Sequence, residues 1–167
     1  MGFPLPGVEL RLADDGEVLL RGPNVFCGYW KQPEATAAAF TADGWFRTGD
    51  IGELDRDGYL RLVGRAGDLI ITGGLNVYPR EVEDALLEHP AVGEVAVAGV
   101  PDDDWGEVVT AWVVPAPTPP GHPAPSELTD FAAERLARFK CPRRIVYVDA
   151  LPRNALGKVL RHELRPD

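Results

Sequence analysis

The sequence has few cysteines and no long apolar run. Cys27 and Cys141 are its only cysteines, and neither lies in a CxxC motif or a Cys/His cluster. A disulfide framework and a zinc site are therefore not indicated, and a reducing cytoplasm fits this composition. The start, MGFPLPGVEL, has neither the basic residues nor the apolar core of a signal peptide, and no stretch approaches a membrane span.

Positive charge is also scarce. The 167 residues include 17 Lys and Arg against 26 Asp and Glu, which gives a net charge of -9. Nucleic acids and anionic membranes attract clustered positive charge, so neither is an expected partner. Small molecules or proteins are expected instead. A hydrophobic content of 45% is enough for the core of one ordinary domain or two small ones.

The basic residues that are present gather near the C-terminal end. Between residues 138 and 165 only Asp149 and Glu163 are acidic, whereas eight residues are basic: Arg138, Lys140, Arg143, Arg144, Arg153, Lys158, Arg161 and Arg165. Such a segment is either a solvated face or a surface turned toward phosphates, and composition does not choose between the two.

The first part of the chain has the pattern of β-hairpins. Residues 8–12 and 17–21 are apolar-rich around the turn ADDG, and residues 51–54 and 59–63 flank the turn DRDG. A short helix is expected within residues 33–40. The pattern predicts a β-rich unit over about the first 64 residues.

After Arg65 the pattern becomes mixed, and it predicts an α+β unit with a small three-stranded sheet plus helices. A short strand in AGDLIITGG is followed by a helix that starts near Pro79 and stops at Pro90. The other expected elements are strands at 92–100, 107–114 and 144–148, a helix at 126–139 with Ser126 as its N-cap, and a short helix at 159–164. The proline-rich residues 115–125 are expected to form an exposed connection.

The segment LPRNALGK, residues 151–158, places a glycine directly before a lysine, as phosphate loops do. The full phosphate-loop spacing is missing, because Pro152 stands where the second glycine would be. Val159 also replaces the Ser or Thr that would hold magnesium. Taken alone, such a segment is more often a turn than a site.

Four segments in order resemble successive motifs of the acyl-CoA synthetases, within the acyl-adenylate-forming, AMP-binding superfamily. They are GEVLLRGPNVFCGYWKQPEAT, GWFRTGDIGELDRDGYLRLVGR, GDLIITGGLNVYPREVE and LPRNALGK. The third and fourth, with LARFKCPRRIVYVDA between them, are most similar to malonyl-CoA synthetases and to neighbouring short- and medium-chain ligases.

The resemblance implies two domains. Residues 1–65 would be the last β-subdomain of an N-terminal AMP-binding domain, and residues 66–167 the mobile C-terminal domain. It also implies that the rest of the N-terminal domain, with the phosphate loop, the adenine pocket, the acyl pocket and the Mg ligand, lies outside this chain. We therefore expect a truncated fragment that is inactive alone.

The same resemblance implies roles for individual residues. Lys158 matches the catalytic lysine that bridges the substrate carboxylate and the α-phosphate of ATP, where a cation between two anions lowers the barrier. Asp50 matches the aspartate that accepts hydrogen bonds from both ribose hydroxyls of ATP or AMP. Arg65 matches an arginine near the ribose and phosphates. Without the resemblance, these residues would fit a loop lysine, a turn aspartate and a surface ion pair equally well.

The glycines carry the second half-reaction in this resemblance. Gly73 and Gly74 would line the tunnel for the pantetheine arm of CoA, where the lack of a side chain lets the thiol pass close to the backbone. The hinge position two residues after Arg65 is Gly67, where the family usually has Asp or Lys. A glycine there allows more backbone conformations, which leaves the preferred orientation open.

Two functions remain at this point. The first is part of an ATP-dependent acyl-CoA synthetase, an acid–thiol ligase of fatty acid metabolism that uses a carboxylate, ATP and CoA. The alternative is a non-catalytic module that docks on a partner or is acylated on Lys158. An activity assay of the chain discriminates between them.

Overall fold

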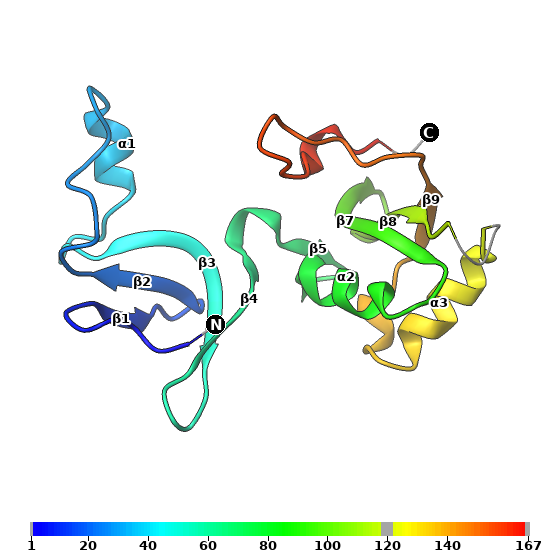
Figure 1. Ribbon diagram of the computed structural model, residues 1–167, viewed down its shortest axis with the longest axis horizontal. Helices are drawn as coiled ribbons and strands as arrows, with labels where there is room; N and C mark the ends of the chain where they lie inside the picture. Colours follow the sequence, from blue (N-terminus) through cyan, green and yellow to red (C-terminus); the bar gives the residue numbers. More distant parts are fainter. Residues whose placement is uncertain (1, 118–121, 166–167) are drawn as a thin grey trace. The chain divides into compact units, whose positions relative to one another are not determined.

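The computed structural model describes residues 2–117 and 122–165, and it divides the chain into two compact units (Figure 1). Unit 1 is Met1–Gly67 and unit 2 is Asp68–Asp167. The assignment of residues 1–65 and 66–167 to two domains of an adenylate-forming enzyme stays a prediction.

Unit 1 is a four-stranded antiparallel meander. Its strands follow chain order: β1 (Glu9–Leu12), β2 (Glu17–Arg21), β3 (Phe46–Leu54) and β4 (Leu60–Arg65). Both predicted hairpins are confirmed by the β1–β2 and β3–β4 pairings. The predicted helix is α1 (Pro33–Ala38), in the connection between β2 and β3. The core of this unit is small and consists of Val18, Leu19, Trp45, Ile51 and Leu60.

Unit 2 confirms the α+β class, but its sheet has five strands instead of the predicted three. The order is β6 (Leu75–Val77), β5 (Ile70–Thr72), β8 (Gly106–Pro115) and β7 (Val92–Asp102), and β9 (Arg144–Tyr147) pairs in parallel with β8. β5 is the short strand predicted within AGDLIITGG, whereas β6 was not predicted, because it has only three residues and no periodicity marks it in the sequence. They join the sheet where Thr72 pairs with Gly106.

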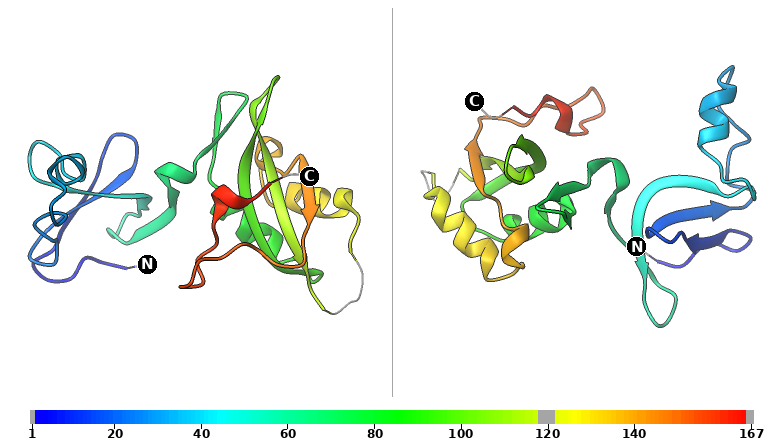
Figure 2. Two further views of the ribbon diagram at one scale, coloured as in Figure 1. Left: turned by 90° about the horizontal axis from the view of Figure 1, so that it is seen from above. Right: turned by 180° about the vertical axis from the view of Figure 1, so that it is seen from behind.

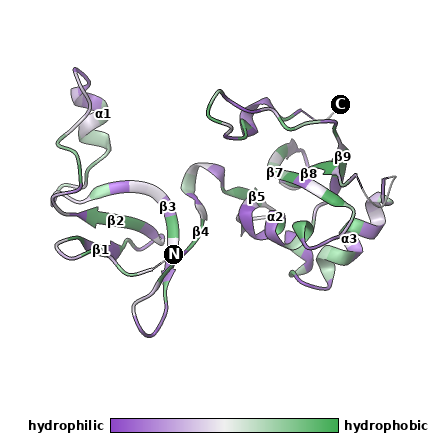
Figure 3. Ribbon diagram, in the orientation of Figure 1, coloured by the Kyte–Doolittle hydropathy of each residue, from purple (hydrophilic) through white to green (hydrophobic). Residues whose placement is uncertain are grey.

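β8 is buried on both faces, which explains why it is rich in apolar residues. Figure 3 colours each residue of the two units by its hydropathy. Val109, Ala111 and Val113 pack under the helices α2 (Pro79–Leu87) and α3 (Pro125–Ala133). On the other face, Trp112 packs against Leu151 and Leu164 of the C-terminal segment. The Trp112 indole is 1% exposed and donates to the backbone oxygen of Arg165 at 3.1 Å. The C-terminal segment is therefore fixed to the sheet.

Three helix predictions need correction. The helix predicted at 126–139 is α3, which ends at Ala133 and is followed by a separate 3₁₀ turn, Arg138–Lys140. The Arg135 guanidinium donates to the backbone oxygen of Phe131 in the last turn of α3. The N-cap of α3 is Ala124 and not Ser126, since Pro125 occupies the first turn. The terminal helix expected at 159–164 is a 3₁₀ turn, Arg161–Glu163. Within the predicted connection 115–125, residues 118–121 lie outside the described residues.

Candidate functional site

Asp50 and Arg65 are brought together in unit 1. They face each other across β3 and β4, and Arg65 Nε donates to Asp50 Oδ1 at 2.8 Å. The Asp50 side chain is 26% exposed and the Arg65 side chain 54% exposed. The carboxylate therefore has one oxygen oriented by a cation while part of it still faces solvent.

A β-bulge presents Asp50 at this place. Leu19 pairs with Arg47 and Glu17 pairs with Ile51, so residues 48–50 lie opposite the single residue Val18. Gly49 in the bulge has a φ of 71°, a value that a side chain would make unfavourable. The bulge turns the backbone immediately before Asp50.

Lys158 lies in unit 2, in a tight loop closed by Asn154. The amide of Asn154 donates to the backbone oxygen of Lys158 at 2.9 Å, and the amide of Lys158 donates back to Asn154 Oδ1 at 2.9 Å. Gly157 takes a φ of 81°, and the bridge between Arg153 and Val159 closes the loop base. Lys158 is exposed, and its ammonium makes no hydrogen bond or ion pair with any residue that the structure describes.

Two arginines hold the Lys158 loop on the sheet. Arg153 donates to the backbone oxygen of Gly157 at 2.7 Å and pairs with Glu94 of β7. Beyond the loop, Arg161 donates to Asp68, to the backbone oxygen of Val97 and to the buried carboxylate of Glu83. The backbone around Lys158 is thus fixed, while its side chain projects into solvent.

Gly73 and Gly74 form the two-residue turn between β5 and β6. Their φ values are 55° and 77°, as a type I′ hairpin requires. The Gly73 amide donates to the backbone oxygen of Trp105 at 2.9 Å, and a Cβ on Gly73 would lie 2.9 Å from the Trp105 ring. The Arg143 guanidinium also lies over the Trp105 ring, with its Cζ 3.7 Å from the ring centroid. The turn is therefore packed closely against an aromatic side chain.

The glycine turn and the lysine loop lie at opposite ends of unit 2, as the left view of Figure 2 shows. The turn contacts Trp105 in the β7–β8 connection, whereas the loop is held on Glu94 near the start of β7. The strand between Glu94 and Asp102 is roughly 25 Å long at the usual rise per residue. The structure thus separates these two predicted features.

Gly67 lies at the boundary of the two units, in a 3₁₀ turn formed by Ala66–Asp68. A Cβ added at Gly67 would have open space around it. Asp68, the next residue, is held by Arg161 of unit 2. Gly67 is therefore the last residue before the part of the chain that is held by unit 2. Its role as a hinge stays a prediction.

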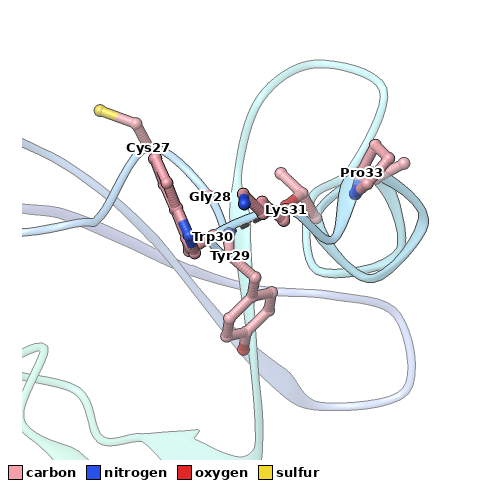
Figure 4. A pocket seen from close by; sticks show the side chains of 8 residues that line it. Cys27, Gly28, Tyr29, Trp30, Lys31 and Pro33 are labelled. Carbon is pink, nitrogen blue, oxygen red and sulfur yellow. Dashed lines mark hydrogen bonds between the residues drawn. The ribbon is translucent and has the colours of Figure 1, made fainter.

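A separate pocket of about 550 Å³ lies on unit 1 and contains none of the predicted site residues (Figure 4). Its lining is Cys27, Gly28, Tyr29, Trp30, Lys31, Pro33, Thr36 and Ala37. Within residues 2–117 and 122–165, no group of three or more His, Cys, Asp or Glu side chains could hold a metal ion. In the same part of the chain, no helix has the length and apolar content to cross a membrane.

Several residues around the candidate site were not anticipated from the sequence. They are Glu17 and Thr48 at the bulge, Trp105 at the glycine turn, and Asn154 and Arg161 around the lysine loop. Each of these residues makes a hydrogen bond to a site residue or to a residue beside it, either within a turn or between strands and loops that are distant in the sequence. The only sequence signal is the Asn-x-x-Gly spacing in LPRNALGK, which is typical of an Asn-closed turn.

Comparison with known proteins gives consistent matches. Residues 81–158 match the family model described as AMP-binding enzyme C-terminal domain. The chain is 49% identical to a dioxo-octahydroindenyl propanoyl:CoA ligase of Rhodococcus jostii, covering 99% of this chain and 32% of that protein. It is also 49% identical to 2-succinylbenzoate–CoA ligase of Geobacillus kaustophilus, over 98% of this chain and 35% of that protein.

A solved structure gives the same result. The o-succinylbenzoate CoA synthetase of Bacillus subtilis, in complex with its acyl-adenylate intermediate, matches with a TM-score of 0.90 at 42% identity. The match covers 98% of this chain and 35% of that chain, so our chain spans about a third of the length of its relatives. Residues 81–158 thus match an AMP-binding enzyme C-terminal domain, and the whole chain is similar to about a third of the length of known CoA ligases.

Proposed function

We propose that this chain is the C-terminal part of an ATP-dependent acyl-CoA synthetase. The complete enzyme converts a carboxylate and ATP into acyl-AMP and pyrophosphate, and then transfers the acyl group to CoA. The observation that carries the proposal is the Lys158 loop, which fixes the backbone on both sides of an exposed ammonium. The acyl-adenylate bound to the Bacillus subtilis relative supports the same chemistry.

The first half-reaction uses Lys158, Asp50 and Arg65. Attack of a carboxylate on the α-phosphate brings two anions together, and the Lys158 ammonium stabilises the negative charge that they share. The Asp50 carboxylate accepts hydrogen bonds from the two ribose hydroxyls. Arg65 holds that carboxylate through the 2.8 Å contact and adds positive charge near the nucleotide.

The second half-reaction uses the Gly73–Gly74 turn, which lines the path of the CoA thiol. Since the turn and the lysine loop are at opposite ends of unit 2, one orientation of this unit cannot bring both to the same acyl group. A change in the backbone conformation of Gly67 between the two steps would rotate unit 2 and present first the lysine loop and then the glycine turn. Gly67 is the position for this change because the next residue, Asp68, is already held by Arg161 of unit 2.

The partners follow from the same scheme. An N-terminal domain of the kind present in the relatives supplies the adenine and acyl pockets and the Mg ligand, and the substrates are a carboxylic acid, ATP and CoA. The acyl groups in the names of the relatives are a succinylbenzoate and a bicyclic propanoate, so the shared substrate class is the carboxylic acid. We place the enzyme in the cytoplasm, where its two free cysteines stay reduced.

The test is an assay of the full-length enzyme that contains this chain. Carboxylate-dependent exchange of pyrophosphate into ATP reports the first step, and thiol consumption from CoA reports the second. We expect both activities in the full-length enzyme and neither in the 167-residue chain. A full-length protein that binds a partner or is acylated on Lys158, but activates no carboxylate in a broad panel, would support the non-catalytic alternative.

A further inference from the structure

Glu17 is a buried carboxylate in a unit with a small core. It is the first residue of β2 and only 6% exposed. Burying a charged group is costly unless each oxygen has a partner. Glu17 Oε2 accepts from Arg47 Nη1 at 2.7 Å, and Glu17 Oε1 accepts from the Gly49 amide at 3.0 Å. Both partners precede Asp50 by three residues or fewer.

The contact with Gly49 is part of the β-bulge at residues 48–50. A bulge interrupts the backbone hydrogen bonds of a sheet, so its amides need other acceptors. Glu17 satisfies the Gly49 amide, and the Thr48 hydroxyl satisfies the Asp50 amide at 3.1 Å. The same hydroxyl donates to the backbone oxygen of Val18 at 2.7 Å. Two side chains thus replace the regular ladder around Asp50.

We infer that Glu17 is a positioning residue for Asp50, with Thr48 as its support, and that it determines how strongly the site selects the ribose of an adenine nucleotide. This inference rests on the proposed function, in which Asp50 receives the ribose hydroxyls. Glu17 itself touches no substrate. It fixes the turn of the backbone from which the Asp50 side chain projects.

A carboxylate suits this role better than an amide. Both of its oxygens accept hydrogen bonds, whereas glutamine offers one acceptor and one donor. In Glu17→Gln, either the Gly49 amide or the Arg47 guanidinium loses its hydrogen-bond acceptor. The backbone of the bulge is then held less firmly in one conformation. A role in stability alone would affect all substrates equally, but a role in positioning affects the ribose contact selectively.

The experiment compares ATP with 2′-deoxy-ATP in the adenylation step of the full-length enzyme. We expect Glu17→Gln to reduce the preference for ATP, as the ratio of kcat/KM values, by about tenfold, the scale for one lost buried hydrogen bond. The KM for ATP should rise while the KM for the carboxylate is unchanged. Thr48→Val should act in the same direction. Glu9→Gln is the matched control, because Glu9 is an exposed carboxylate of the same sheet, paired with Arg21.

The outcomes separate the inference from the proposed function. If Asp50→Asn leaves the preference for ATP intact, the ribose role of Asp50 in the proposed function is wrong. If Asp50→Asn abolishes the preference but Glu17→Gln retains it, only the inference about Glu17 is wrong. Should Glu17→Gln fail to fold, Thr48→Val removes the other side-chain hydrogen bonds that support the bulge. If the Thr48→Val enzyme then keeps the full preference for ATP over 2′-deoxy-ATP, the inference is overturned.

Discussion

Arg65 Nε lies 2.8 Å from Asp50 Oδ1, and the two residues are direct partners in the β3–β4 register. An ion pair this exposed contributes little to folding, with a typical value of about 0–1 kcal/mol. Its consequence is geometric, since the cross-strand position and the hydrogen bond together hold one carboxylate oxygen in place. The pair is therefore better suited to orient a ligand-binding group than to stabilise unit 1.

The first prediction tests this interpretation with Arg65→Gln in the full-length enzyme. We expect the KM for ATP to rise about tenfold, on the scale of a lost charge-assisted hydrogen bond. The urea midpoint of the chain should hardly move, because the pair is exposed. Arg80→Gln is the control, since it removes an exposed ion pair with Asp84 on α2. A large loss of stability with an unchanged KM would assign Arg65 a structural role.

Sequence patterns predict those parts of the fold whose signal is local. The hairpin turns around Gly16 and Gly58 follow from Asp-Gly composition, and both glycines have positive φ values. The run over β8 follows from burial on two faces. By contrast, β6 has three residues, of which Leu75 and Asn76 are exposed, and no periodicity distinguishes it from a loop.

The same limit applies to the site. Lys158, Asp50 and the glycines stand out because of the motifs that contain them. Glu17 contacts the bulge across 32 residues, and Arg161 reaches Glu83 across 78 residues. These contacts depend on strand register and on the path of the C-terminal segment. Neither is encoded by spacing within one motif, so only the structure reveals the residues that support the site.

A second prediction concerns the packing of the glycine turn. Gly74→Ala should destabilise the chain by about 1–2 kcal/mol, since an L-residue is placed in the left-handed region. Gly73→Ala should cost about 1–3 kcal/mol more, because its Cβ would overlap the Trp105 ring. Urea denaturation of both variants measures the difference. Equal losses would show that the Trp105 ring moves aside without cost.

The two cysteines should differ in reactivity. Burial raises the pKa of the Cys141 thiol, whose Sγ also contacts the backbone oxygen of Ala137. A raised pKa leaves less of the reactive thiolate at any given pH, and burial blocks access. At pH 8 we expect a maleimide to label the exposed Cys27 and to label Cys141 only in denaturant. Mass spectrometry of the Cys27→Ser variant checks this, and rapid native labelling of that variant would contradict it.

The hinge prediction uses solution scattering. Because a Cβ at Gly67 meets open space, a side chain there changes the backbone freedom without a clash at its Cβ. The 167-residue chain should scatter as a mixture of orientations of its two units, and Gly67→Pro should narrow that mixture. Scattering that fits one rigid orientation and does not change in Gly67→Pro would rule out Gly67 as the hinge.

The last prediction concerns Lys158 and separates the two half-reactions. In the full-length enzyme, Lys158→Ala should lower pyrophosphate exchange by about a hundredfold to a thousandfold, the scale for losing one preorganised group that stabilises charge. Thiol consumption from supplied acyl-adenylate should be retained far better, because the glycine turn that serves this step lies at the opposite end of unit 2 from the lysine loop. Lys158→Ala should also fold normally, since the exposed ammonium holds no other described residue. Arg144→Ala is the control for removing an exposed positive charge from the same basic segment. An equal loss in both half-reactions would mean that Lys158 supports both steps, and the assignment of one step to each end of unit 2 would then be wrong.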